Sequence, residues 1–242
     1  MTSGRVTDRI GEDQVMFGRG LDHGHVTELV IFDSDGVLVD SERIANAVLA
    51  EAATSEGAAI SAEEALRLFR GLKMADCVAE IERRSGRRVR DSFVADVRSA
   101  TAVAFEADLQ PIEGIHAALA AITVPVCVVS NGPMSKLTHT LGLTKLLDHF
   151  EGRIFSAYDV GSWKPDPGLF LHAARTLGAA TSRCVVVEDS LPGVRAAKAA
   201  GMRALGFVGS DGKAALELAA DCACVFHSMN ELPALLQRKA WT

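Results

Sequence analysis

Short apolar runs rich in β-branched residues recur along the chain, and a stretch with helical spacing follows most of them. The runs predict strands and the stretches predict helices of about 10–15 residues, which is the pattern of βαβ units in a parallel sheet. Expected strands cover residues 30–32, 124–129, 154–156, 184–187, 204–208 and 224–226, and expected helices cover 134–143, 167–177, 191–200, 212–219 and 230–237. The predicted fold class is therefore α/β, with a doubly wound, Rossmann-like parallel sheet whose strands all end at one edge.

Residues 42–110 show helical spacing and no convincing strand. Ser61 and Glu64 form a capping box, a pairing typical of a helix start, and Asp40 or Ser41 can cap a helix that begins near residue 42. The expected helices begin near residues 42 and 61 and cover about 74–84 and 91–107. Four helices after the first strand predict an all-helical cap domain over 41–110, inserted into a core domain of residues 27–40 and 111–242.

Residues 1–26 differ from the rest of the chain in composition. They are rich in Gly, Asp, Arg and His and show no periodicity. Such a segment cannot bury enough apolar surface to fold, so it is predicted to be a disordered tail or the product of an upstream start site.

Overall composition limits the classes of partner. The chain is 48% hydrophobic and 23% charged, with a net charge of −6 and no long basic run, which argues against a nucleic-acid partner. Its longest apolar runs fall far short of the roughly 20 residues of a membrane span. The odd number of cysteines, five, and their scattered positions predict a reducing, cytoplasmic compartment.

Polar residues stand where four of the predicted strands end or just beyond. In chain order they are Asp33 and Asp35, Ser130 and Asn131, Lys164, and Glu188 and Asp189. Because open α/β sheets bind ligands at the carboxyl ends of their strands, these groups are expected to meet in one site.

The chemistry of these groups is complementary. Neighbouring carboxylates repel one another unless a cation lies between them, and Mg²⁺ is the hard cation that prefers oxygen ligands. Ser130 supplies a hydroxyl at a helix start, where backbone N–H groups suit an oxyanion, and Lys164 supplies a positive charge. Together they predict a site for phosphoryl transfer from a small phosphorylated metabolite.

Each motif alone also has a purely structural interpretation. Asp-x-Asp and Ser-Asn-Gly occur in ordinary turns, Lys-Pro is a common helix start, and Glu-Asp-Ser can be a helix cap. The four motifs in this order, each associated with a strand end, favour the functional interpretation over the structural one.

With these four motifs, residues 27–238 resemble the haloacid dehalogenase-like hydrolase superfamily. The match is to the branch with a helical cap after the first motif, which includes phosphoglycolate phosphatases and β-phosphoglucomutase. The resemblance implies that Asp33 is a nucleophile that becomes phosphorylated and that Asp35 is the general acid and base. It also implies that Ser130 and Asn131 bind the phosphoryl group and that Lys164 neutralises its charge.

The resemblance further implies a Mg²⁺ site made by Asp33, the main-chain carbonyl of Asp35, Asp189 and Glu188, the last directly or through water. Runs at 127–133, 155–159 and 162–167 are most similar to bacterial 6-phosphogluconate phosphatases, which implies a sugar or sugar-acid phosphate as substrate. Arg70 and Lys73 fall at the position of the branch's substrate-specificity loop, where they would bind the far end of the substrate. Lys73 can equally be a solvated lysine in a turn between helices.

Two other functions are compatible with some or all of these motifs. A phosphomutase of the β-phosphoglucomutase type uses the same four motifs. A phospho-aspartate signalling receiver also combines carboxylates, a hydroxyl and a lysine, but receivers place the phosphate acceptor on a later strand and lack a long helical insert. The chain is expected to be a monomer or a weak homodimer.

Overall fold

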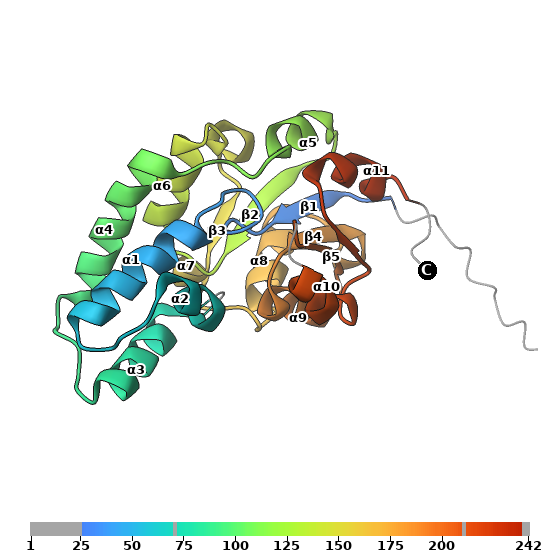
Figure 1. Cartoon of the computed structure of the whole chain (residues 1–242). Helices are drawn as coiled ribbons and strands as arrows, with labels where there is room; N and C mark the ends of the chain where they lie inside the picture. Colours follow the sequence, from blue (N-terminus) through green and yellow to red (C-terminus); the bar gives the residue numbers. More distant parts are fainter. Residues whose placement is uncertain (1–25, 70–71, 210–211, 239–242) are drawn as a thin grey trace, which may run out of the picture.

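A six-stranded parallel sheet forms the centre of the computed structural model, which describes residues 26–69, 72–209 and 212–238. The strand order is β3-β2-β1-β4-β5-β6 (Figure 1). The strands are β1 (Leu29–Phe32), β2 (Val126–Ser130), β3 (Ile154–Ser156), β4 (Cys184–Glu188), β5 (Arg203–Phe207) and β6 (Cys224–Phe226). The predicted doubly wound sheet is confirmed, with strand ends shifted by no more than two residues.

Strand β1 is buried along its whole length and pairs with β2 on one side and β4 on the other. Phe32, its last residue, lies beside Val128 and Val187, so the three strands end close together. The chain runs from β1 out to β3 in one direction and returns to place β4 on the opposite side. This reversal is the topological switch point at which such sheets bind ligands.

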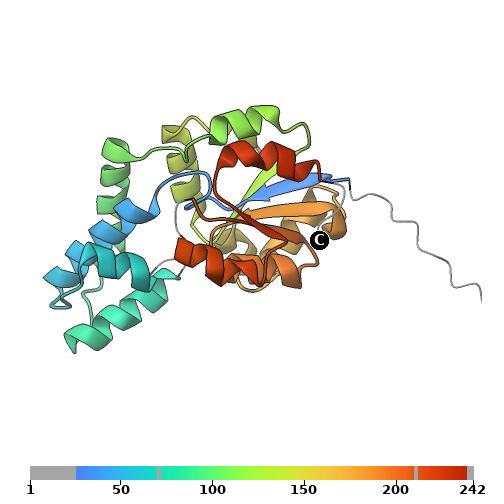
Figure 2. The same ribbon diagram turned by 45° about the vertical axis from the view of Figure 1, so that its right-hand side comes forward.

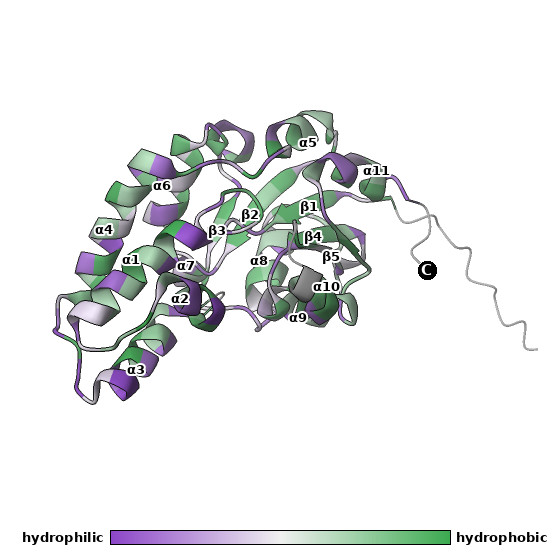
Figure 3. Cartoon of the chain, in the orientation of Figure 1, coloured by the Kyte–Doolittle hydropathy of each residue, from purple (hydrophilic) through white to green (hydrophobic). Residues whose placement is uncertain are grey.

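Side chains of β1 alternate between two apolar layers, as a strand buried on both faces requires. Val30 and Phe32 belong to the layer under α5 (Ile115–Ala121), α6 (Met134–Leu143) and α11 (Leu232–Leu236). Leu29 and Ile31 belong to the layer under α8 (Gly168–Thr176), α9 (Leu191–Ala199) and α10 (Gly212–Ala219). The apolar character of the sheet between these layers is visible in Figure 3.

An all-helical cap lies to one side of the sheet in both ribbon views (Figures 1 and 2). It consists of α1 (Glu42–Ser55), α2 (Ala62–Phe69), α3 (Met74–Ser85) and α4 (Phe93–Asp108). The cap has its own apolar cluster, which includes Leu49, Ile81 and Phe93, because amphipathic helices of this length need a partner face to be stable. The exact domain boundaries, at 41 and 110, stay a prediction.

The two segments that connect the core to the cap run side by side. The amide of Asp40 donates to the carbonyl of Gln110 at 2.9 Å, and the amide of Ile112 donates to the carbonyl of Leu38 at 2.9 Å. Both connections between core and cap therefore run together through one hydrogen-bonded segment, which begins a few residues after Asp35.

Some local expectations were wrong or lie outside the described residues. Helices α5 and α7 (Ala157–Val160) were not predicted; they have seven and four residues, too few for helical spacing to be recognised. The last predicted helix is a 3₁₀ turn, η3 (Met229–Glu231), followed by α11. Residues 1–25 of the predicted tail are not among those described. Within the described residues, no helix has the length and apolar content to cross a bilayer.

Candidate active site

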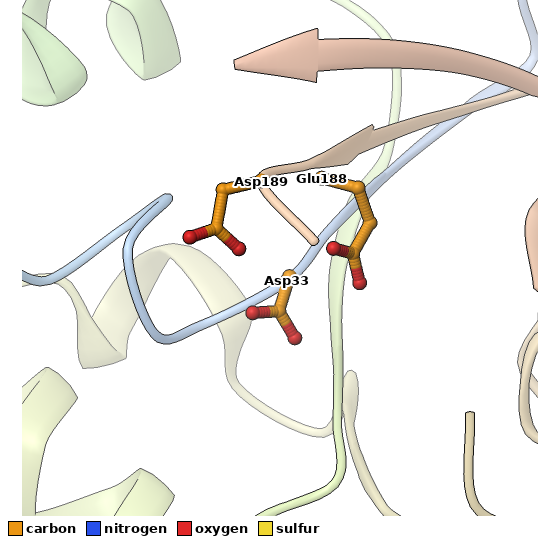
Figure 4. A group of neighbouring side chains, drawn as sticks. All are labelled: Asp33, Glu188 and Asp189. Atoms are coloured by element: carbon orange, nitrogen blue, oxygen red, sulfur yellow. The ribbon is translucent and has the colours of Figure 1, made fainter. Parts of the chain in front are cut away.

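Three buried carboxylates meet where β1 and β4 end. Asp33 follows β1, Glu188 ends β4 and Asp189 follows it, and one oxygen from each lies within 4.8 Å of the others. The three side chains face one another in Figure 4. Burial raises the pKa of Asp33 well above its usual value, and the charges of Glu188, Asp189 and Asp35 add to this, against the opposing effect of Lys164.

Lys164 is the positive charge within this cluster. Its Nζ donates to Asp33 Oδ1 at 2.5 Å, to Glu188 Oε1 at 2.6 Å and to the carbonyl of Val129 at 2.9 Å. Burial alone would lower the pKa of Lys164, but the two carboxylates outweigh burial and raise it. The lysine is therefore held as a cation with its Nζ fixed by three acceptors.

Ser130 and Asn131 stand at the end of β2, next to the carboxylates. Ser130 is buried and its Oγ accepts from the amide of Gly132 at 3.1 Å. Asn131 Oδ1 accepts from the amide of Lys164 at 2.9 Å, so the loop after β2 fixes the loop that carries the lysine. Gly132 and Pro133, just before α6, line the same cavity, and the start of a helix suits an anion.

The main chain packs closely against the carboxylates of the acidic cluster. A Cβ at Gly36, which has φ +76°, would lie 2.2 Å from Asp189 Oδ2, and a Cβ at Gly193 would lie 1.8 Å from Glu188 Oε1. Both glycines let the main chain pack directly onto a carboxylate. Three carboxylates, buried together and offering only oxygen ligands, fit a hard divalent cation.

Asp35 lies apart from this cluster and has two partners that the sequence did not indicate. Lys136 Nζ donates to both of its carboxylate oxygens, at 2.7 and 2.8 Å, and Ser41 Oγ donates to Oδ1. Burial would raise the pKa of Asp35, but Lys136 and Ser41 outweigh burial and the pKa is lowered.

Ser41 is the N-cap residue of α1, as the sequence allowed, but its side chain makes no capping hydrogen bond to the helix and instead donates to Asp35. Lys136 lies in the first turn of α6, right after the Ser130 motif. Its place at a helix start on the sheet edge indicated that Lys136 lies near the site, but nothing in the sequence identified Asp35 as its partner.

A cavity of about 440 Å³ joins the strand ends to the cap. All seven strand-end residues identified from the sequence line it, and Lys73 lines it from the cap side. Apolar residues of the cap, among them Leu49, Phe69 and Phe105, form much of the rest of the wall. Lys73 is exposed, and its Nζ lies 5.3 Å from the ring centroid of Trp163. The predicted substrate residue Arg70 lies outside the described residues.

Fold and site together define an α/β protein whose candidate reacting groups stand at the ends of parallel strands, beside a helical cap. The model of the haloacid dehalogenase-like hydrolase family matches residues 27–201. The chain belongs to this family.

Relatives named for their activity indicate the class of reaction within this family. The chain is 34% identical to 6-phosphogluconate phosphatase of Escherichia coli, over 88% of this chain and 96% of that protein. It is 30% identical to hexitol phosphatase B of the same organism, over 72% of this chain and 81% of that protein. A crystal structure of a haloacid dehalogenase-like protein of unknown function from Agrobacterium tumefaciens superposes with a TM-score of 0.77 at 36% identity, covering 87% of this chain and 97% of that one. The chain is a hydrolase of the phosphatase class, which excludes the signalling receiver.

Proposed function

We propose that the protein is a Mg²⁺-dependent phosphatase that hydrolyses a small phosphorylated sugar or sugar acid, similar to 6-phosphogluconate, through an aspartyl-phosphate intermediate. The observation that carries this proposal is the buried Asp33 carboxylate, held by Lys164 and facing Glu188 and Asp189. The two Escherichia coli relatives support the substrate class, since their names denote phosphatases of a sugar acid and of hexitols.

Asp33, Asp189 and the main-chain carbonyl of Asp35 would hold Mg²⁺, and Glu188 would contribute through water. Glu188 is assigned the indirect role because its oxygens already accept from Lys164 and from Ser190. The bound cation would supply positive charge that offsets the repulsion between a carboxylate and a phosphate dianion.

In the proposed reaction, an Asp33 oxygen attacks phosphorus and the bond from phosphorus to the leaving oxygen breaks. Lys164, the Ser130 hydroxyl and the Asn131 amide bind the transferred group as its charge redistributes. Because Lys136 and Ser41 lower the pKa of Asp35, Asp35 would take up a proton from solvent before it acts as the acid. It would give this proton to the leaving oxygen and then remove one from water, whose oxygen attacks phosphorus and frees Asp33. Lys136 and Ser41 would set the position of Asp35 between these steps.

The proposal is tested by phosphate release from a panel of phosphorylated metabolites. Enzyme stripped of divalent ions with a chelator is expected to be inactive, and Mg²⁺ is expected to restore hydrolysis of 6-phosphogluconate or a hexitol phosphate. Glucose 1-phosphate belongs in the panel because its isomerisation without phosphate release would instead show the phosphomutase reaction. Failure to release phosphate from any monoester, with Mg²⁺ present, contradicts the proposal.

Lys73→Ala tests whether the cap binds the substrate away from the phosphate. Because Lys73 lines the cavity from the cap, the variant is expected to raise KM for the sugar phosphate about tenfold, the effect of losing one charge-assisted hydrogen bond. KM for a generic aryl phosphate should change much less. Lys198→Ala, an exposed lysine on α9, is the control, and equal effects of Lys73→Ala on both substrates would refute the role.

A further inference from the structure

Two cations of the cap rest on two aromatic rings of the core, at one wall of the cavity. Arg98 of α4 donates from Nη2 to the Tyr158 hydroxyl at 3.1 Å, and its guanidinium carbon lies 5.7 Å from the centroid of that ring. Tyr158 packs edge-on against Trp163 with centroids 5.7 Å apart, and Lys73 lies over Trp163. All four side chains line the cavity that contains Asp33 and Lys164.

Most of the arginines described in the cap pair with a carboxylate, and Arg98 does not. Arg83 and Arg84 pair with Glu80, and Arg90 pairs with Glu56. In the part of the chain that the structure describes, no carboxylate forms an ion pair with Arg98. A guanidinium on an aromatic face keeps its charge and most of its donors available to a ligand.

The cavity also carries positive charge away from the strand ends. Asp33, Glu188 and Asp189 gather at the strand ends around Lys164, whereas Arg98 and Lys73 lie on the cap side. A phosphate monoester bound at the strand ends would direct the rest of its chain toward these cap cations. A volume of about 440 Å³ lies in the range of small-molecule sites and leaves room for such a chain.

We propose that Arg98, positioned by Tyr158, is a specificity-determining residue that binds an anionic group at the end of the substrate away from the phosphate. The enzyme then prefers phosphorylated sugar acids to neutral sugar or hexitol phosphates. Arginine suits this role because its planar fork can bind both oxygens of a carboxylate. The inference rests on the proposed phosphatase function and deepens it by naming the charge of the substrate's second end.

The alternative role for Arg98 is a latch that only holds the cap against the core through Tyr158. Substrate charge separates the two roles. A latch affects every substrate that needs a closed cap, whereas a carboxylate-binding residue affects only substrates that carry the second charge.

The test compares 6-phosphogluconate with glucitol 6-phosphate, which has the same six-carbon chain and a hydroxymethyl group in place of the carboxylate. Wild-type enzyme is expected to prefer 6-phosphogluconate. Arg98→Gln is expected to lower kcat/KM for 6-phosphogluconate by about tenfold to a hundredfold, mainly through KM, and to change that for glucitol 6-phosphate less than about twofold. Arg98→Lys should retain part of the preference for 6-phosphogluconate. Tyr158→Phe, which keeps the ring, should lose less of this preference than Arg98→Gln does.

Arg67→Gln serves as the matched control, because Arg67 is an exposed arginine of the cap that pairs with Glu63. Equal losses on both substrates in Arg98→Gln would show a latch and overturn the inference, as would no loss on either. A wild-type enzyme that releases phosphate equally fast from both substrates also overturns it while leaving the phosphatase function intact. If neither these nor any other phosphate monoester is hydrolysed, the proposed function fails and this inference fails with it.

Discussion

Asp33→Asn is expected to abolish phosphate release while the chain remains folded. Asparagine has almost the same shape as aspartate, but its neutral amide oxygen is a poor nucleophile, so no acyl phosphate can form. Loss of a covalent nucleophile typically lowers turnover by about four orders of magnitude or more. The measurement is release of phosphate from 6-phosphogluconate and from an aryl phosphate, with Mg²⁺ present.

The stability of this variant has a definite expected sign. Burial raises the pKa of Asp33, so at neutral pH the ionised carboxylate costs the folded state free energy that the protonated form does not. Asparagine resembles the protonated form, and in chelator the variant should therefore unfold at a temperature no lower than that of the wild type. With Mg²⁺ added, the wild type should gain more stability than the variant, because the variant has lost one ligand.

Asp40→Asn is the control for this experiment, since Asp40 lies in the same segment but is exposed. It should keep most of its activity. Substantial hydrolysis of the aryl phosphate by Asp33→Asn would rule out Asp33 as the nucleophile.

The fold and the strand-end chemistry were accessible from the sequence for a shared physical reason. A strand buried on both faces must be apolar throughout, so the sudden change from Phe32 to Asp33 marks both a strand end and a site. The same change occurs after Val129 and again at Glu188. In a parallel sheet these ends lie at one edge, so positions far apart along the chain can be brought together by topology alone.

The partners of Asp35 and the cap-side wall of the cavity could not be predicted in this way. Lys136 lies 101 residues after Asp35 in the sequence, and Tyr158 lies 60 residues after Arg98. Both depend on how the cap and α6 are oriented relative to the sheet, which no periodicity in the sequence records. Ser41 shows the same limit, because its position before a helix suggested a cap although its hydroxyl binds the carboxylate six residues earlier.

Lys164→Met is expected to lower both activity and stability, and stability most strongly in the absence of divalent ions. Methionine keeps the length of the side chain but removes the only cation that contacts both Asp33 and Glu188 among the described residues. Because these carboxylates are buried, removing their partner leaves uncompensated charge, which typically costs about 3–5 kcal/mol of unfolding free energy. Mg²⁺ should recover part of this loss, since a divalent cation supplies positive charge to the same carboxylates.

Chemical denaturation in chelator and in Mg²⁺ measures both effects. Lys198→Met is the control: Lys198 pairs with Asp221 but is largely exposed, and surface pairs of this kind contribute less than about 1 kcal/mol. If Lys164→Met in chelator were as stable as this control, the buried carboxylates would not depend on the lysine for charge compensation. If its stability fell and Mg²⁺ restored none of the loss, the three carboxylates would not form the proposed cation site. Recovery of stability by Mg²⁺ without recovery of turnover would assign Lys164 a role in the reaction beyond holding Asp33 in place, because the fold and the cation site would then be intact.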